Sequence, residues 1–113
     1  MKSTATGRSA ETAVAEYLVR QGYKVITQNW RTKTCEIDIV AQKNRVVYFV
    51  EVKYRFASAQ GDGFDYITQG KLKQMHYAAQ VWVSEHNWNG DYRLAAAAVS
   101  GDSYQNIEII EID

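Results

Sequence analysis

The sequence lacks the features that mark several common classes of protein. One cysteine among 113 residues leaves no partner for an internal disulfide bond. No apolar run reaches membrane-spanning length, and the amino terminus has no basic segment followed by a hydrophobic one. Thirteen basic residues balance thirteen acidic ones, so no overall field draws the chain to nucleic acid. We therefore expect a cytoplasmic protein that binds no membrane.

Motifs of other chemistries are also missing. The two histidines, His76 and His86, form no cluster with Cys35, which speaks against a zinc site. There is no glycine-rich phosphate loop, no internal repeat and no proline. A composition of 46% hydrophobic and 23% charged residues is typical of a globular protein. We expect a single domain over residues 1–113, with residues 1–6 as a loose tail.

The stretch 46–54 is the centre of the predicted fold. It is rich in β-branched and aromatic residues, which favours a central strand, yet it carries Glu51 and Lys53 near its end. Alternate residues of a strand share a face, so these two charges point to the same side. Burying charges is costly unless they are paired or bind something. They form either an exposed ion pair or part of a site.

The preceding stretch, 35–42, also predicts a strand. In it Ile37 and Ile39 alternate with acidic residues, one of which is Asp38. Aspartate is depleted in strands, so its presence inside one requires an explanation.

A tight turn at 43–45 predicts that the two strands form a hairpin. Neighbouring strands lie about 5 Å apart, which brings Asp38 near Glu51. If the register places Asp38 on the face of Glu51 and Lys53, two carboxylates and an ammonium converge on one patch.

Residues 7–21 carry apolar side chains at helical spacing and predict a first helix. At 100° per residue, Glu11 falls about 20° from Leu18, on the rim of the buried stripe. Glu11 therefore either looks across at the sheet or is a first-turn glutamate favoured by the helix dipole.

A second helix is predicted over 65–86, after a glycine-containing loop at 56–64 that would lie at the mouth of the site. Lys71 falls within the apolar stripe of this helix. Its side chain either reaches the acidic patch or extends along the rim of the helix into solvent.

Three further strands are predicted, at 23–30, 92–100 and 107–112. The second of them contains four consecutive alanines, which favour helix, but the run is short and bounded by glycines. A helix of this length between strands allows a crossover, so the fourth strand should run parallel to the third. We expect an α/β fold, a mixed sheet flanked by helices in the order α-β-β-β-α-β-β.

An ordered set of positions runs along nearly the whole chain: Gly7, Glu11, Gly22 with Tyr23, Asn29, Glu36-Ile37-Asp38, Phe49-Val50-Glu51-Val52-Lys53, Arg55 and Lys71. Taken in order, these residues resemble the signature of the YraN family of bacterial proteins. That family is similar to archaeal Holliday junction resolvases and to the restriction-endonuclease-like, PD-(D/E)XK nucleases. Two positions depart from the family pattern: Cys35 stands where glycine is usual, and Ala95 where aspartate is usual.

The resemblance implies a site residue by residue. Asp38 and Glu51 would be metal-binding carboxylates, Glu11 would complete the acidic site, and Lys53 would assist the attacking water. Crowded carboxylates repel one another unless a cation neutralises them, and hard oxygen ligands suit Mg²⁺ or Mn²⁺. Lys71 matches a recurrent lysine of the family.

Two functions are compatible with the sequence. The first is a Mg²⁺-dependent DNA endonuclease, for which branched DNA is a candidate substrate. Arg55 and Lys71 are its candidate substrate contacts. A homodimer could gather its basic residues on one face, which would offset the zero net charge. The second is a non-catalytic module that binds nucleic acid or protein, in which the same acidic residues form structural ion pairs.

Overall fold

The computed structural model describes residues 9–55 and 64–113. Two helices and five strands follow in the predicted order, which confirms the α/β class. Their bounds are α1 Ala10–Arg20, β1 Lys24–Arg31, β2 Glu36–Lys43, β3 Val46–Tyr54, α2 Gln69–His86, β4 Asp91–Ser100 and β5 Asn106–Glu111. The predicted tail at 1–6 and nearly all of the loop at 56–64 lie outside the described residues.

The strands form one sheet in the order β1-β2-β3-β4-β5. Strands β3 and β4 pair in parallel, as predicted, and the other neighbouring pairs are antiparallel. The turn between β2 and β3 consists of Asn44 and Arg45, with φ angles of 53° and 66°. Positive φ at both central residues suits the twist of a hairpin, so the predicted tight turn is confirmed.

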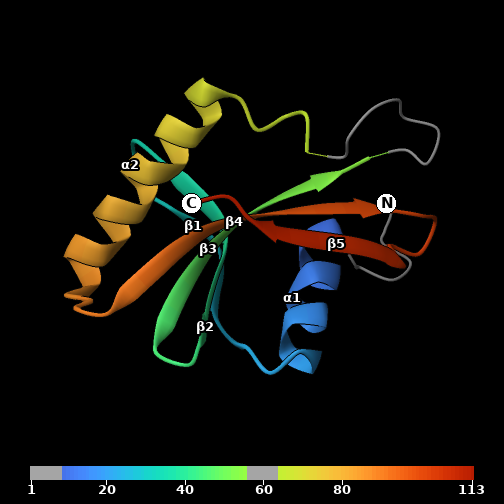
Figure 1. Ribbon diagram of the computed structural model, residues 1–113, viewed down its shortest axis with the longest axis horizontal. Coiled ribbons are helices and arrows are strands. Elements are labelled where there is room, and N and C mark those ends of the chain that lie inside the picture. The colour runs from blue at the N-terminus through green and yellow to red at the C-terminus, as the bar shows by residue number, and fades with distance from the viewer. Residues whose placement is uncertain (1–8, 56–63) are drawn as a thin grey trace.

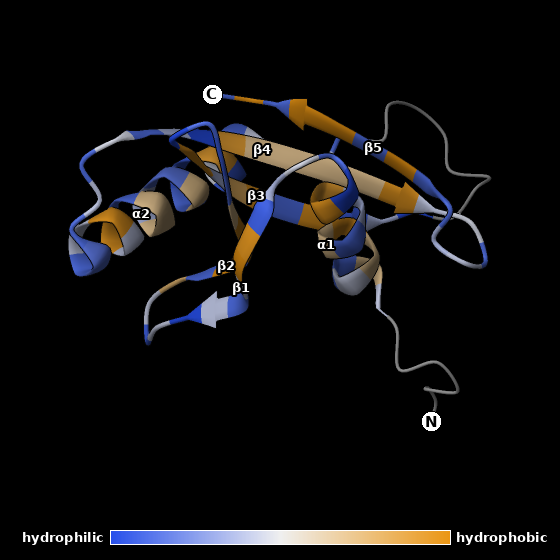
Figure 2. Ribbon diagram, turned by 90° about the horizontal axis from the view of Figure 1, so that it is seen from below, coloured by the Kyte–Doolittle hydropathy of each residue, from blue (hydrophilic) through white to orange (hydrophobic). Residues whose placement is uncertain are grey.

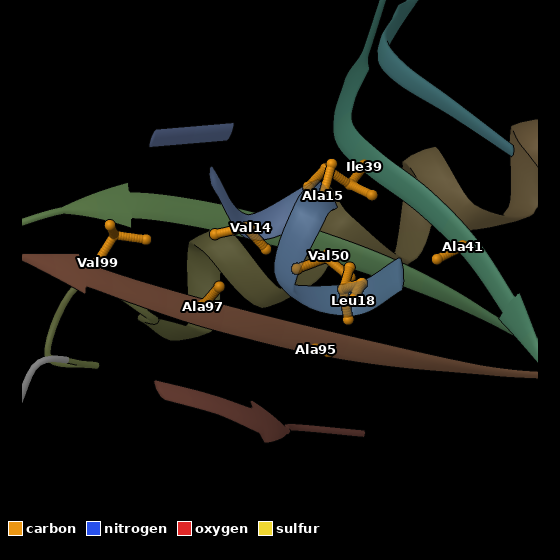
Figure 3. Packing of buried hydrophobic residues seen from close by; sticks show 9 residues of the cluster. All are labelled: Val14, Ala15, Leu18, Ile39, Ala41, Val50, Ala95, Ala97 and Val99. Atoms are coloured by element: carbon orange, nitrogen blue, oxygen red, sulfur yellow. The ribbon is translucent and has the colours of Figure 1, made fainter. Parts of the chain in front are cut away.

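The helices cover opposite faces of the sheet, with α2 on one side and α1 on the other (Figure 1). Under α1, three helix residues meet strand residues from β2, β3 and β4 (Figure 3). The nine buried members of this cluster are Val14, Ala15, Leu18, Ile39, Ala41, Val50, Ala95, Ala97 and Val99. A second buried cluster, centred on Phe49 and Trp82, fills the space under α2. The sheet is thus covered by hydrophobic packing on both faces.

The alanine-rich stretch is a strand, although alanine favours helix. Ala95 and Ala97 lie in the buried cluster under α1, and their small side chains let the helix pack close to the strand. Figure 2 shows that β4 is hydrophobic along most of its length, whereas α2 mixes polar and apolar residues. Burial on both faces therefore decides the structure of β4 over local propensity.

Helix α2 begins four residues later than predicted. Thr68 has an extended backbone and acts as N-cap, its hydroxyl accepting a hydrogen bond from the backbone N–H of Lys71 at 3.1 Å. Ser9 caps α1 in the same way. The predicted start at Asp65 was wrong because the apolar periodicity does not reveal where the cap lies. No helix in the described parts of the chain combines the length and hydrophobicity needed to cross a membrane.

Candidate functional site

Strands β2 and β3 separate at Asp38. Their pairing ends at Ile39 and Val50, and beyond that point the Asp38 carboxylate accepts the backbone N–H of Val52 at 2.8 Å. A side chain thus replaces the backbone partner that a continuing strand would have supplied. We call this point the fork of the sheet.

The backbone around the fork departs from regular alternation. Ile37 packs under α2, whereas Ile39 packs under α1, although a regular strand places residues two apart on one face. On β1, Asn29 faces this segment with a φ of 53°. An irregular ladder of this kind can aim a side chain that a flat strand would have paired or buried.

Glu11, in the first turn of α1, lies beside Asp38. Its Oε1 atom is buried and has no hydrogen-bond partner among the described residues. Burial raises the pKa of Glu11 to about 7, and the neighbouring Asp38 carboxylate contributes to the rise. Burial likewise raises the pKa of Asp38, although the Val52 N–H opposes this. Of the two interpretations of Glu11, the structure shows the one in which it looks toward the sheet.

Glu51 lies on the α2 side of β3 and is bound by Lys71. The Lys71 Nζ atom is 2.8 Å from the Glu51 carboxylate, and the side chains are 33% and 19% exposed. Burial raises the pKa of Glu51, while the Lys71 ammonium counteracts it. Of the two alternatives for Lys71, the structure therefore shows the one in which its side chain reaches the acidic patch, and not the one in which it extends into solvent.

Lys53 is exposed and lines a hollow of about 420 Å³, together with Glu51 and Lys71. The same hollow includes Thr68 and Gly70 at the start of α2. Glu51 pairs with Lys71 rather than with Lys53, which was one of the two alternatives for these charges. Lys53 still shares the α2 side of β3 with Glu51, so an anion in the hollow would meet both lysines.

Arg55 follows the end of β3, where its backbone N–H donates to the Val99 carbonyl at 2.7 Å. Its charge acts on the nearby Tyr66 and lowers the pKa of that phenol, against the larger effect of burial, which raises it. Arg55 therefore lies at the same end of the sheet as the hollow.

Tyr66 is a site neighbour that sequence reasoning missed. Its hydroxyl lies 3.4 Å from the Glu51 carbonyl and 3.3 Å from the Ala97 carbonyl, to which it donates. These contacts attach the segment before α2 to β3 and β4, and so position Lys71. The available signal was weak, an aromatic residue with a polar tip just before a helix.

A second hollow, of about 470 Å³, lies on the other side of Glu51 and Lys71. Tyr77, 48% exposed, lines it, and its hydroxyl is 3.1 Å from that of Thr34. The ion pair therefore separates two hollows along the surface. Cys35, one of the departures from the family pattern, also lines this second hollow.

Ala95, the other departure, is placed differently. It is 2% exposed in the core under α1 and pairs with Val50 on β3. Its side chain is a packing element rather than part of the charged site.

The donor atoms at the fork are carboxylate oxygens, the ligands that Mg²⁺ and Mn²⁺ prefer. Glu11 supplies a buried oxygen without a partner, and Asp38 lies next to it. Within the described residues, however, no three Asp, Glu, His or Cys side chains are gathered closely enough to hold a metal. Of the three acidic residues, Glu51 is the one whose carboxylate is ion-paired with Lys71.

Fold and site together define an α/β protein whose sheet opens at a fork lined by acidic side chains and lysines. The chain belongs to the uncharacterised protein family UPF0102, whose family model matches residues 10–112. This is the YraN family that the sequence resembles.

Relatives in several bacteria match the chain over most of its length. A UPF0102 protein of Vibrio campbellii is 36% identical, covering 93% of this chain and 88% of its own. One from Sulfurihydrogenibium is 37% identical, covering 96% and 95%. A third, from Cytophaga hutchinsonii, is 33% identical over 90% of each chain. The chain therefore matches most of the length of each of these relatives.

Proposed function

We propose that the protein is a metal-dependent endonuclease that hydrolyses phosphodiester bonds in DNA. The observation that carries this proposal is the fork, where Glu11 and Asp38 lie side by side. On the neighbouring strand, Glu51 lies next to Lys71 and lines the hollow that Lys53 also lines. Half-buried acidic residues with raised pKa values are typical of functional sites. The resemblance to Holliday junction resolvases and PD-(D/E)XK nucleases supports the same reaction.

Glu11, Asp38 and Glu51 would hold Mg²⁺ or Mn²⁺. The unpartnered Glu11 oxygen and the hard oxygen donors fit such an ion. A bound divalent cation would neutralise the carboxylates and make a water molecule a stronger nucleophile near neutral pH.

The chain's own residues would position the substrate. Lys53, exposed at the hollow, would orient the attacking water or offset negative charge on the reacting phosphate. Arg55 and Lys71 would contact neighbouring phosphates, with charge rather than base contacts providing affinity. The formal net charge is zero, so a homodimer that gathers these residues from two copies would strengthen binding. Branched DNA is the substrate class that the resemblance to resolvases favours.

A second candidate is a DNA- or protein-binding module without catalysis. The Lys71–Glu51 ion pair favours it, because a carboxylate that is already paired needs no metal. The absence of a three-ligand group among the described residues points the same way. The two functions differ in their predictions for DNA cleavage. The endonuclease cuts DNA in a reaction that needs Asp38 and a divalent cation, whereas the binding module does not cut DNA.

The test is cleavage of labelled single-stranded, duplex, flap and four-way-junction DNA in Mg²⁺ or Mn²⁺. We expect the wild type to cut at least one of them and Asp38→Asn to lose about 100-fold or more in rate, because one ligand is removed. Asparagine can still accept the Val52 N–H, so the fork should remain folded. Glu108→Gln, which removes an exposed carboxylate on β5, is the matched control. Equal cleavage by Asp38→Asn and the wild type would refute catalysis at the fork.

A further inference from the structure

The Lys71–Glu51 contact distinguishes Glu51 from the other two acidic residues of the fork. Glu11 and Asp38 interact directly with each other, whereas the Glu51 carboxylate points to an ammonium at 2.8 Å on α2. A contact this short between charged groups is a charge-assisted hydrogen bond. Both side chains are mostly shielded from water, so the bond is little weakened by solvent.

The position of Lys71 is built into the fold rather than being an accident of a flexible side chain. Its backbone N–H is held by the N-cap Thr68, and Tyr66 attaches the preceding segment to the carbonyls of Glu51 and Ala97. The start of α2 is therefore fixed against the same stretch of β3 that carries Glu51. Lys53, two residues further along β3, is exposed instead.

We infer that Lys71 is a resident counter-ion that competes with the metal for Glu51, so that the three carboxylates form a complete site only when Lys71 is displaced. This inference rests on the proposed function and concerns the regulation of the same site. It accounts for the finding that no three ligand side chains are gathered among the described residues. Displaced from Glu51, the ammonium would still face the hollow that Lys53 lines, where a phosphate would attract it.

Competition makes an unusual prediction, that removing a residue of the site improves metal binding. Without Lys71, the largely buried Glu51 carboxylate loses its partner, and an unpaired buried charge is unfavourable. A divalent cation would then gain the full attraction of Glu51. Lys71→Met should tighten Mn²⁺ binding about tenfold, within the range usual for coupling between sites.

The experiment is titration of Mn²⁺ into the purified full chain without DNA, with free Mn²⁺ followed by electron paramagnetic resonance. Wild type, Lys71→Met, Lys71→Gln and Lys73→Met are compared at the same ionic strength. Lys73 is an exposed lysine of the same helix turn, so its variant removes the same charge without touching Glu51. Circular dichroism melting checks that each variant is folded, and the glutamine variant serves if the methionine variant is not.

The inference predicts tighter Mn²⁺ binding in both Lys71 variants and little change in Lys73→Met. Equal or weaker binding in the Lys71 variants, or the same gain in Lys73→Met, would overturn it while leaving the proposed metal site intact. If no variant binds Mn²⁺ at all, the proposed function fails together with the inference. The two failures are thus distinguished in one series.

Discussion

Asp38 connects the structure of the sheet to the chemistry of the fork. Its carboxylate satisfies a backbone N–H of β3 where pairing with β2 has ended, so the strands can separate without leaving that donor unpaired. The same carboxylate lies against Glu11 and raises its pKa. One side chain therefore both satisfies the N–H left by the separated strand and belongs to the acidic pair beside it.

Glu11 makes the stability of the metal-free protein depend on pH. Its pKa is about 7 in the folded chain and 4.5 in an ordinary environment, so the folded state binds the proton more tightly. This contribution to stability is fully present below pH 4.5 and is lost as pH rises through about 7. Because the side chain is partly solvated, we expect a loss of about 1 kcal/mol.

The measurement is urea unfolding of wild type and Glu11→Gln between pH 4.5 and 8, in the presence of a chelator. Glu11→Gln should match the wild type at low pH and exceed it at pH 8, since glutamine carries no charge to bury. Glu85→Gln, an exposed position on α2, is the control and should follow the wild type throughout. Parallel pH profiles for wild type and Glu11→Gln would contradict the assignment of Glu11 to the acidic cluster.

At the scale of the elements, the site depends on how the start of α2 is attached to the sheet. The Tyr66 hydroxyl reaches carbonyls of both β3 and β4, the two strands that pair in parallel. This attachment places Lys71 opposite Glu51. Helix, strands and ion pair are thus parts of one arrangement.

Tyr66→Phe should lower the free energy of unfolding by about 1 kcal/mol, because it removes the part-buried hydrogen bond from the hydroxyl to these carbonyls. Tyr77→Phe is the matched control. Its hydroxyl contacts an exposed threonine, so water can replace the lost bond and the change should be close to zero. Chemical denaturation of both variants measures the difference, and equal effects would show that the Tyr66 contacts do not hold α2.

The elements were predictable because their signals are local. Strand β3 follows from its β-branched and aromatic composition, the hairpin from its short polar turn, and both helices from apolar periodicity. The site was less predictable because its contacts depend on register and twist. The irregularity that sends Ile37 and Ile39 to opposite faces, and the contacts of Tyr66, arise only when distant segments meet. For the same reason, the position of Lys71 on α2 did not predict that its side chain pairs with Glu51.

At the scale of the whole molecule, one sheet brings together residues from α1, β2, β3 and α2 that are up to 60 positions apart, Glu11 to Lys71. Helices on opposite faces supply Glu11 from one side and Lys71 from the other, with the fork between them. We propose that this convergence forms a site for a divalent cation. A ligand that binds only the folded state must stabilise it.

Binding of a divalent cation at this site is tested by the melting temperatures of the wild type, Glu51→Gln and Glu108→Gln, each with and without millimolar Mn²⁺. We predict a rise of about 5 °C in the wild type and in the exposed control Glu108→Gln, which corresponds to about 1 kcal/mol for a chain of this size. Glu51→Gln should show no rise, because it lacks a ligand. No Mn²⁺-dependent rise in the wild type, or the same rise in Glu51→Gln, would contradict the account.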